Sequence, residues 1–236
     1  MVKISKLTLC FLNLLVCYFL CRDVVAQETN MNNYGIKKIK HIVLLGASVG
    51  KAWDISQLPE RIGNHEYTFE YVGEYSFDKT EKLMNILYRK QNKPDAIIIK
   101  ECAAFFPGNL KAYQDLIIKW VEPCRKENVV PILTTVVPVV DTFPLRMFLI
   151  NLLHKKLYYP NNVLKSIIIF NDWIKEFAKK ENLVVLDLES AVRISNRNRH
   201  LRNNFAKKDG LHLNDKAYKK LDKIIIPTLN KINWER

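Results

Sequence analysis

The chain has 236 residues, of which 48% are hydrophobic and 26% are charged, and this ordinary globular composition indicates one or at most two domains. Its formal net charge of +13 at pH 7 can indicate nucleic acid, an anionic surface or an acidic polymer as partner. The basic residues are dispersed, however, and no zinc-finger spacing or aromatic RNA-binding signature accompanies them. We therefore expect a solvated basic surface and no nucleic-acid partner.

The N-terminal segment has the features of an export signal. Lysines precede an apolar run of about 14 residues over 7–20, and small residues up to Ala26 stand where a signal peptidase would cut. The run is shorter than the ~20 residues that a spanning helix needs, which makes an uncleaved membrane anchor the weaker alternative. We expect a signal peptide at 1–26 and one domain at 27–236, exported to the periplasm or outside the cell and without stable membrane insertion.

From Ile39 onward, short apolar runs rich in Val and Ile alternate with longer segments of helical period. This alternation is typical of a parallel sheet flanked by helices. The sequence predicts strands at 41–45, 67–72, 95–100, 129–137 and 183–188, and helices near 78–91, 109–126, 162–181 and 214–232. We therefore expect a single three-layer α/β domain with a five-stranded parallel sheet.

Two segments fall outside this pattern. Residues 141–160 are rich in Leu, Phe and Ile between prolines, which predicts an extra helix that belongs to the core, covers an active site or faces a membrane. Residues 193–208 are crowded with basic side chains and predict a solvated loop, with contact to an anionic substrate as the alternative.

The cysteines and most histidines of the predicted domain indicate neither a disulfide framework nor a metal site. Cys102 falls at the carboxyl end of a strand and Cys124 near the far end of the next helix, so we expect them at opposite edges of the sheet, too far apart for a disulfide. Four histidines lack metal-ligand spacing and are interpreted as structural or surface residues: His41, His65, His154 and His200. We expect no metal and no cofactor.

The first chemical signal is Gly46-Ala47-Ser48-Val49-Gly50, directly after the first predicted strand. Small residues on both sides of a serine permit a sharp turn that lifts the hydroxyl above the carboxyl edge of the sheet, where open α/β sheets bind ligands. A phosphate-binding loop fits less well, because it needs four residues between its glycines and a hydroxyl residue after the lysine, whereas Ala52 follows Lys51. A dinucleotide site would need a third glycine. Ser48 is therefore the candidate nucleophile.

The second signal is Asp209-Gly210-Leu211-His212, just before the last predicted helix. A serine hydroxyl is a poor nucleophile until an imidazole accepts its proton, and the imidazole needs a carboxylate or carbonyl to hold its tautomer and orientation. One turn of chain can bring the side chains of Asp209 and His212 to the same side, beside Ser48. The two motifs together predict a catalytic set of Ser48, Asp209 and His212.

The α/β-hydrolase fold also uses a G-x-S-x-G turn, but its nucleophile follows several strands, whereas Ser48 follows the first. Over about residues 39–232 the chain instead resembles the SGNH hydrolases, also called GDSL esterases and lipases. That family has a flavodoxin-like sheet, a nucleophilic serine after the first strand and Asp-x-x-His near the C-terminus; Ala47 stands where it usually has aspartate. The resemblance implies that Ser48 attacks an ester, that His212 acts as general base and then acid, and that Asp209 orients His212.

The resemblance also implies an oxyanion hole formed by the backbone N–H groups of Ser48 and of Gly73, which follows the second predicted strand. The family usually shows Gly-x-Asn-Asp after its third strand, whereas this chain has Lys100-Glu101-Cys102-Ala103-Ala104 and so lacks the asparagine donor. One missing donor can cost ~3 kcal/mol of transition-state stabilisation. Lys100 and Glu101 end the strand at this edge, where they line the site, pair with each other or face solvent.

These features predict an exported serine esterase that removes an acyl group, for example acetyl, from a carbohydrate or another small ester. An acyltransferase on the same fold is one alternative, because a sugar hydroxyl can replace water in the second step. A non-catalytic carbohydrate-binding relative is another, motivated by the absent asparagine and by the basic loop before Asp209. The sequence leaves the oligomeric state open.

Overall fold

The computed structural model describes residues 39–234, apart from 103–105, 107, 142–159, 209 and 211. The chain divides after Lys38, and all described elements belong to the unit that begins at Ile39. The expected signal peptide and nearly all of the predicted extra helix at 141–160 lie outside the described residues. None of the helices that can be described is long and apolar enough to cross a membrane.

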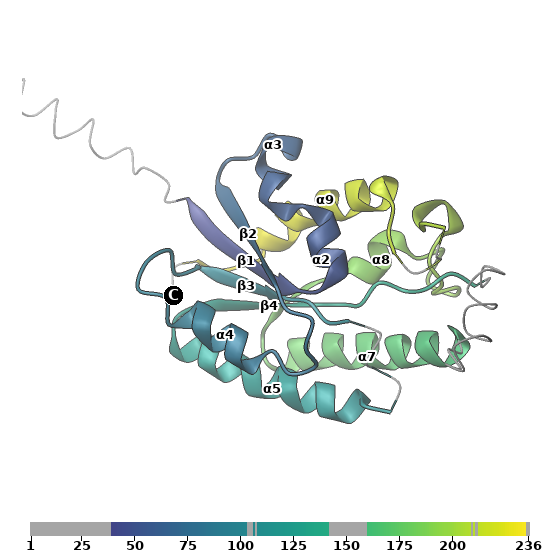
Figure 1. Ribbon diagram of the computed structural model, residues 1–236, viewed down its shortest axis with the longest axis horizontal. Helices are drawn as coiled ribbons and strands as arrows, with labels where there is room; N and C mark the ends of the chain where they lie inside the picture. Colours follow the sequence, from purple (N-terminus) through teal and green to yellow (C-terminus); the bar gives the residue numbers. More distant parts are fainter. Residues whose placement is uncertain are drawn as a thin grey trace, which may run out of the picture. The chain divides into compact units, whose positions relative to one another are not determined.

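The sheet has five parallel strands in the order β2-β1-β3-β4-β5 (Figure 1). The strands are β1 Lys40–Gly46, β2 Tyr67–Gly73, β3 Ala96–Ile99, β4 Val130–Thr134 and β5 Val184–Leu186. The predicted α/β class and parallel sheet are confirmed. β4 ends three residues earlier than predicted, because the backbone of Val136 bonds to the side chain of Asn171, at 2.7 and 2.8 Å, and not to a strand.

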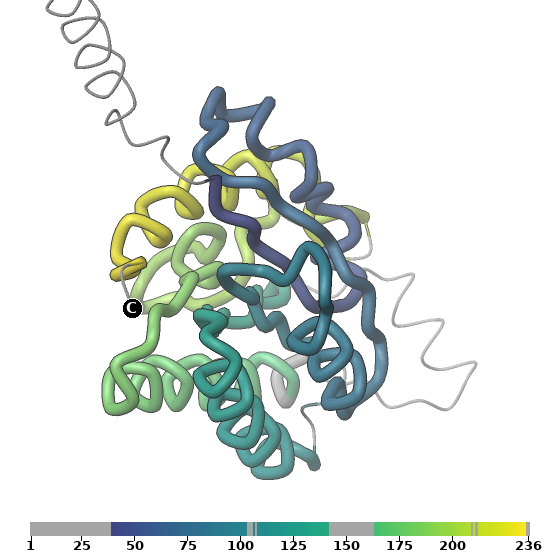
Figure 2. Tube along the Cα trace, turned by 90° about the vertical axis from the view of Figure 1, so that its left-hand side faces the viewer, coloured from purple at the N-terminus to yellow at the C-terminus, as the bar shows by residue number. Residues whose placement is uncertain are grey.

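Helices cover both faces of the sheet (Figures 1 and 2). One face carries α4 Thr80–Leu87, α5 Leu110–Lys126 and α7 Pro160–Lys180. The other carries α2 Ser48–Trp53, α3 Leu58–Ile62, α8 Leu188–Val192 and α9 Asp215–Leu229, with the 3-10 turns η1 Ile55–Gln57 and η3 Asn203–Phe205. The predicted helices are α4, α5, α7 and α9. The short helices α2, α3 and α8 were not predicted, because five or six residues are too few to show a helical period.

The sheet separates two hydrophobic clusters. In β1, Ile42 and Leu44 pack with α2, α8 and α9, whereas Val43 and Leu45 pack with α4, α5 and α7. All four side chains are fully buried, as expected for a parallel strand between two helical layers. Burial of each contributes about 1.5–3 kcal/mol. We call the two sides of the sheet the α9 face and the α5 face.

The two described cysteines are free thiols. Cys124 is buried in α5, and burial raises the pKa of its thiol to about 12. Cys102 is half-buried and follows β3 by three residues, beyond the carboxyl edge of the sheet. Cys124 precedes β4, so the two cysteines belong to opposite edges, as predicted.

Candidate active site

Ser48 is the first residue of α2 and comes two residues after the end of β1. β1 lies between β2 and β3, so this serine stands over the interior of the sheet. The Lys51 amide donates to the Ala47 carbonyl at 3.1 Å, which closes the first helical turn directly after the strand. Ser48 itself is half-buried. The strand, sharp turn and helix that a nucleophile of this motif needs are therefore all present.

Two glycines near this turn lie close to the side chain of Tyr71. A Cβ atom on Gly50 would lie 2.6 Å from Cδ2 of Leu44 and 3.0 Å from Cε2 of Tyr71. A Cβ atom on Gly73 would lie 3.2 Å from the hydroxyl oxygen of Tyr71. The second glycine of G-x-S-x-G thus makes room for the Tyr71 ring, in addition to any role in the turn.

Tyr71 holds the backbone immediately before the serine. Its hydroxyl donates to the Gly46 carbonyl at 3.0 Å and lies 3.2 Å from the Ala47 carbonyl oxygen. Burial and a hydrogen bond with Tyr75 raise the pKa of Tyr71, so the phenol stays protonated and able to donate. Sequence reasoning missed this residue, because a tyrosine inside a strand does not reveal which loop it contacts.

His212 lies in the loop between η3 and α9. Its carbonyl accepts from the Lys207 amide at 2.8 Å, and the Gly210 amide donates to the Lys207 carbonyl at 2.9 Å. Gly210 has φ +70, a left-handed conformation that suits glycine. The side chain of Asn214 caps α9 by accepting from the Ala217 amide at 3.2 Å. His212 is therefore held in a tight turn directly before a fixed helix end.

This turn lies beyond the carboxyl edge of the sheet. The Gly210 carbonyl accepts from the amide of Val140, at 3.4 Å, and Val140 belongs to the extended chain that continues past β4. The same extension binds the preceding loop, since the Leu201 amide donates to the Val139 carbonyl at 2.9 Å.

Ser48 and His212 lie at the same edge and on the same face of the sheet. Val49 and Leu213, the residues that follow them, are both buried in the α9-face cluster. His212 is half-buried. Asp209, the third residue of the predicted set, lies outside the described residues.

Solved structures share this architecture. A GDSL-like lipase from Bacteroides thetaiotaomicron superposes with a TM-score of 0.62, at 18% identity, over 89% of this chain and 97% of its own. A putative acylhydrolase from Bacteroides fragilis superposes with a TM-score of 0.60, at 21% identity, over 81% of this chain and 87% of its own. The fold is that of the SGNH, or GDSL, hydrolases.

A more distant structure has the same GDSL-type fold: an acetylxylan esterase from Geobacillus stearothermophilus, studied as a catalytic mutant. It superposes with a TM-score of 0.55, at 11% identity, over 84% of this chain and 96% of its own. No protein-family model matches the sequence, and no curated protein matches it significantly. The likeness is therefore one of fold.

Within this GDSL-type fold, Gly73 ends β2 opposite Gly46. The neighbouring Glu74 amide donates to the Gly46 carbonyl at 3.0 Å. Because successive residues of a strand turn their N–H groups to alternate sides, the Gly73 N–H faces away from β1, along the free edge that β2 forms. This orientation argues against the expected role of Gly73 as an oxyanion donor, and the same role for the N–H of Ser48 stays a prediction.

Lys100 follows β3 directly, and its amide donates to the Leu45 carbonyl at 2.9 Å. A Cβ atom on Gly46 would lie 3.0 Å from the Cβ of Lys100. Gly46 is two residues after Leu44, so both positions point to the α9 face. Lys100 is only 2% exposed, and its Nζ donates to the backbone carbonyl of Glu101 at 3.0 Å. Burial lowers the pKa of this amine to about 8.

Glu101 points to the α5 face, where its Oε2 lies 2.8 Å from Nζ of Lys79. Both side chains are 1% exposed, and the ammonium also lies 5.6 and 5.8 Å from the ring centres of Tyr113 and Trp120. Burial raises the pKa of Glu101, and the Lys79 charge opposes that rise. Sequence reasoning considered a Lys100–Glu101 pair; the observed partner of the carboxylate is Lys79, which no local pattern indicated.

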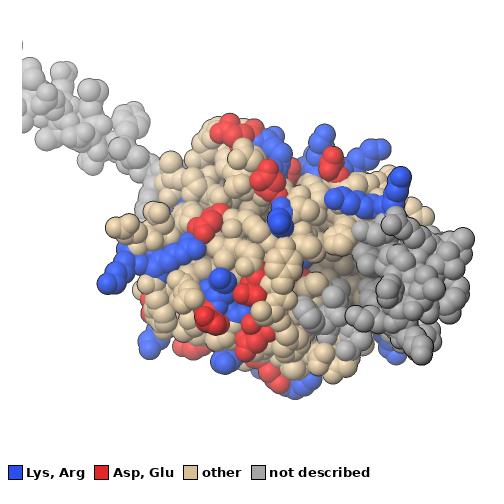
Figure 3. Space-filling model, viewed as in Figure 1, with Lys and Arg blue, Asp and Glu red and all other residues tan. Residues whose placement is uncertain are grey.

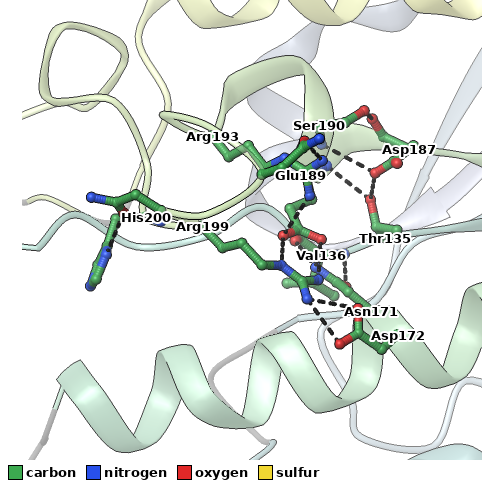
Figure 4. Close-up of polar contacts among 12 residues, drawn as sticks. Thr135, Val136, Asn171, Asp172, Asp187, Glu189, Ser190, Arg193, Arg199 and His200 are labelled. Atoms are coloured by element: carbon green, nitrogen blue, oxygen red, sulfur yellow. Dashed lines mark hydrogen bonds and ion pairs between the residues drawn. The ribbon is translucent and has the colours of Figure 1, made fainter.

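A second buried carboxylate anchors the basic loop at 193–208 (Figure 4). Glu189, in α8, is fully buried, and Arg199 contacts both of its oxygens, with Nη2 2.7 Å from Oε2. Arg193 lies 3.4 Å from Oε1, and the side-chain amide of Asn171 donates to Oε2 at 3.0 Å. Charge-assisted hydrogen bonds of this kind are about twice as strong as neutral ones. The loop that leads to His212 is thereby attached to α8 and α7.

The predicted description of this loop as solvated is therefore correct for only part of it. Arg193 and Arg199 have side chains that are 16% and 15% exposed, and they point inward. Four other basic residues of the loop are exposed: Arg197, Arg202, Lys207 and Lys208. On the face of the molecule in Figure 3, basic and acidic side chains are interspersed. In the part of the chain that the structure describes, no group of three or more His, Cys, Asp or Glu residues could hold a metal ion.

Proposed function

We propose that this chain is an exported serine esterase in which Ser48 is the nucleophile and His212 and Asp209 activate it. The observation that carries the proposal is the arrangement of the two described residues. Ser48 opens the helix after β1 and His212 precedes the last helix, at one edge and on one face of the sheet. The fold supports the same class, because structures that share it include a lipase, an acylhydrolase and an acetylxylan esterase.

In the acylation step, the Ser48 oxygen attacks the ester carbonyl carbon while His212 accepts the hydroxyl proton. A carbon–oxygen bond forms, and the carbonyl oxygen becomes an oxyanion to which the Ser48 N–H donates a hydrogen bond. When this intermediate collapses, the bond to the leaving alcohol breaks and the alcohol oxygen takes the proton from His212. Asp209 keeps the imidazole oriented for both transfers.

In the deacylation step, His212 removes a proton from water, and the resulting hydroxide equivalent attacks the acyl-enzyme carbonyl. The bond to Ser48 then breaks, the free acid leaves, and the serine oxygen recovers its proton from His212. The cycle needs neither a metal nor a cofactor. An acyltransferase would use the same residues with a sugar hydroxyl in place of water, so only the products distinguish the two.

The substrate that we propose is an acyl group, for example acetyl, on a carbohydrate or another small ester outside the cytoplasm. The acetylxylan esterase with the same fold supports this class. A screen of the mature chain, residues 27–236, against acetylated polysaccharides and a series of p-nitrophenyl esters tests it. Release of free acid supports the esterase, and preferential transfer to an added glycan supports the acyltransferase.

The nucleophile is tested by replacing Ser48 with alanine. Turnover of p-nitrophenyl acetate should fall at least about 10³-fold and fluorophosphonate labelling should disappear, while the circular dichroism spectrum stays unchanged. Ser56→Ala is the matched control, because Ser56 is an exposed serine in η1 that bonds only to Asp54 among its described contacts. If the wild-type protein neither turns over the ester nor reacts with the probe, the chain is instead a non-catalytic relative.

A further inference from the structure

The last residues of neighbouring strands form a row across the carboxyl end of the sheet. Only one residue of this row has a large side chain, and it lies next to the Ser48 turn. Gly73 and Gly46 pair across β2 and β1, and Lys100 is the next position along the row. Beyond it comes Thr134, whose hydroxyl donates to a β3 backbone carbonyl at 3.2 Å. The side chain of Lys100 therefore leaves the sheet beside Gly46, the residue of the neighbouring strand that comes two positions before Ser48.

Among the described residues, no carboxylate contacts the buried ammonium of Lys100: burial lowers its pKa, and attraction by the nearby Cys102 and Glu101 groups opposes that lowering. Its hydrogen-bond partner is the backbone carbonyl of Glu101, and within the described part of the chain no ion pair joins it to an acid. The carboxylate of Glu101 lies on the other face, where Lys79 neutralises it. A buried charge is costly unless it is paired, so an ammonium at this position lowers the stability of the fold, and a functional use would explain why it is present.

The position of this charge indicates that use. Nζ bonds to a carbonyl just beyond β3, and Ser48 lies just beyond β1, the neighbouring strand. Adjacent strands are about 4.8 Å apart, so the stem of Lys100 leaves the sheet one strand away from the turn that holds Ser48. A buried positive charge on this side of the turn lowers the barrier to forming an oxyanion there, and a tenfold change in rate needs only about 1.4 kcal/mol of such stabilisation.

We propose that the Lys100 ammonium stabilises the negative charge that develops at Ser48 during acyl transfer, from the strand end where the SGNH hydrolases usually have an asparagine donor. The inference rests on the proposed function. Lys100 acts through its electric field and does not touch the ester, so it is an electrostatic residue behind the nucleophile. It also compensates for the orientation of the Gly73 N–H, which faces away from β1.

The test uses Lys100→Met, Lys100→Gln and Lys100→Arg in the mature chain. For Lys100→Met, we expect kcat with p-nitrophenyl acetate to fall at least about tenfold, with KM changed less than about twofold. The rate of fluorophosphonate labelling should fall with kcat. The melting temperature of this variant should equal or exceed that of the wild type, because an unneutralised buried charge is removed. Opposite effects on activity and on melting temperature are not expected from a purely structural lysine.

Lys51→Met is the matched control. Lys51 is an exposed lysine in the same helix as Ser48, so its charge is screened by solvent and its removal should leave kcat within about twofold. If Lys100→Met folds poorly, the comparison of Lys100→Arg with Lys100→Gln decides, because only the arginine keeps the charge. The arginine variant should then be the faster by about tenfold.

Two different results would contradict the inference, and they can be told apart. If the wild-type protein is labelled at Ser48 and the uncharged Lys100 variants react within about twofold of it, the role of Lys100 is wrong and the esterase proposal stands. If the wild-type protein is not labelled at Ser48, the proposed function itself fails, and the inference fails with it.

Discussion

The two faces of the sheet each bury a lysine, and they treat its charge differently. On the α5 face, Lys79 lies 2.8 Å from the Glu101 carboxylate and over two aromatic rings. On the α9 face, Lys100 has a backbone carbonyl as its hydrogen-bond partner and lies beside the Ser48 turn. A neutralised charge is typical of an interior that holds the fold together, whereas a buried charge without a counter-ion is typical of a functional site.

The strongest test of this comparison between the two buried lysines is to break the Lys79–Glu101 ion pair on the α5 face. Lys79→Met leaves the Glu101 carboxylate buried without its partner, so the free energy of unfolding should fall by about 3–5 kcal/mol. Urea denaturation monitored by circular dichroism measures this. The exposed pair Lys93–Glu127 provides the control, since Lys93→Met should cost less than about 1 kcal/mol. Equal losses of unfolding free energy in the two variants would show that the buried pair contributes no more to stability than the exposed pair does.

Lys100, the buried lysine of the α9 face, should change how the free energy of unfolding depends on pH. Burial lowers the pKa of Lys100 from its ordinary 10.5 to about 8. Below pH 8 the amine is charged in both states, and the full cost of burying it is present. Between pH 8 and 10.5 the unfolded chain binds more protons than the folded one, so stability rises with pH. The wild type should therefore gain about 3 kcal/mol relative to Lys100→Met across this window.

Urea titrations of both proteins at pH 7, 8, 9 and 10 check this expectation. The difference between the two proteins isolates Lys100, because every other titrating group is common to both. A constant difference over the whole range would mean that the buried amine titrates near its ordinary pKa, and the contrast between the two lysines would lose its basis.

The same contrast separates what the sequence could predict from what it could not. Strands are predicted by Val- and Ile-rich runs, which report local burial, and all five are present. Ser48 and His212 were predicted because their types and spacing are tied to one chemistry, and the parallel topology then explains why they share an edge.

The residues that support the site were not predictable in this way, because their partners are set by packing. Lys79 meets Glu101 across 22 positions, and Tyr71 meets Gly46 across 25. Gly73 was assigned a role from its place in a motif, but the direction of its N–H depends on the register with β1, which the sequence does not show. Local patterns therefore predicted the candidate catalytic residues, and only the structure revealed the contacts that hold the Ser48 turn in place.

The smallest effect in this comparison is expected from replacing Tyr71. Tyr71→Phe keeps the ring that packs against Gly50 but removes the hydrogen bond to the Gly46 carbonyl, so the free energy of unfolding should fall by about 1 kcal/mol. The peptide groups that precede Ser48 would then be held less firmly, and kcat should fall several-fold with little change in KM. Tyr88→Phe is the control, since Tyr88 is 58% exposed and should tolerate the loss of its hydroxyl. A Tyr71→Phe variant with wild-type kcat but reduced stability would show that the tyrosine supports only the fold. On this face, the charge of Lys100 would then be coupled to the chemistry, and the rigidity of the turn would not.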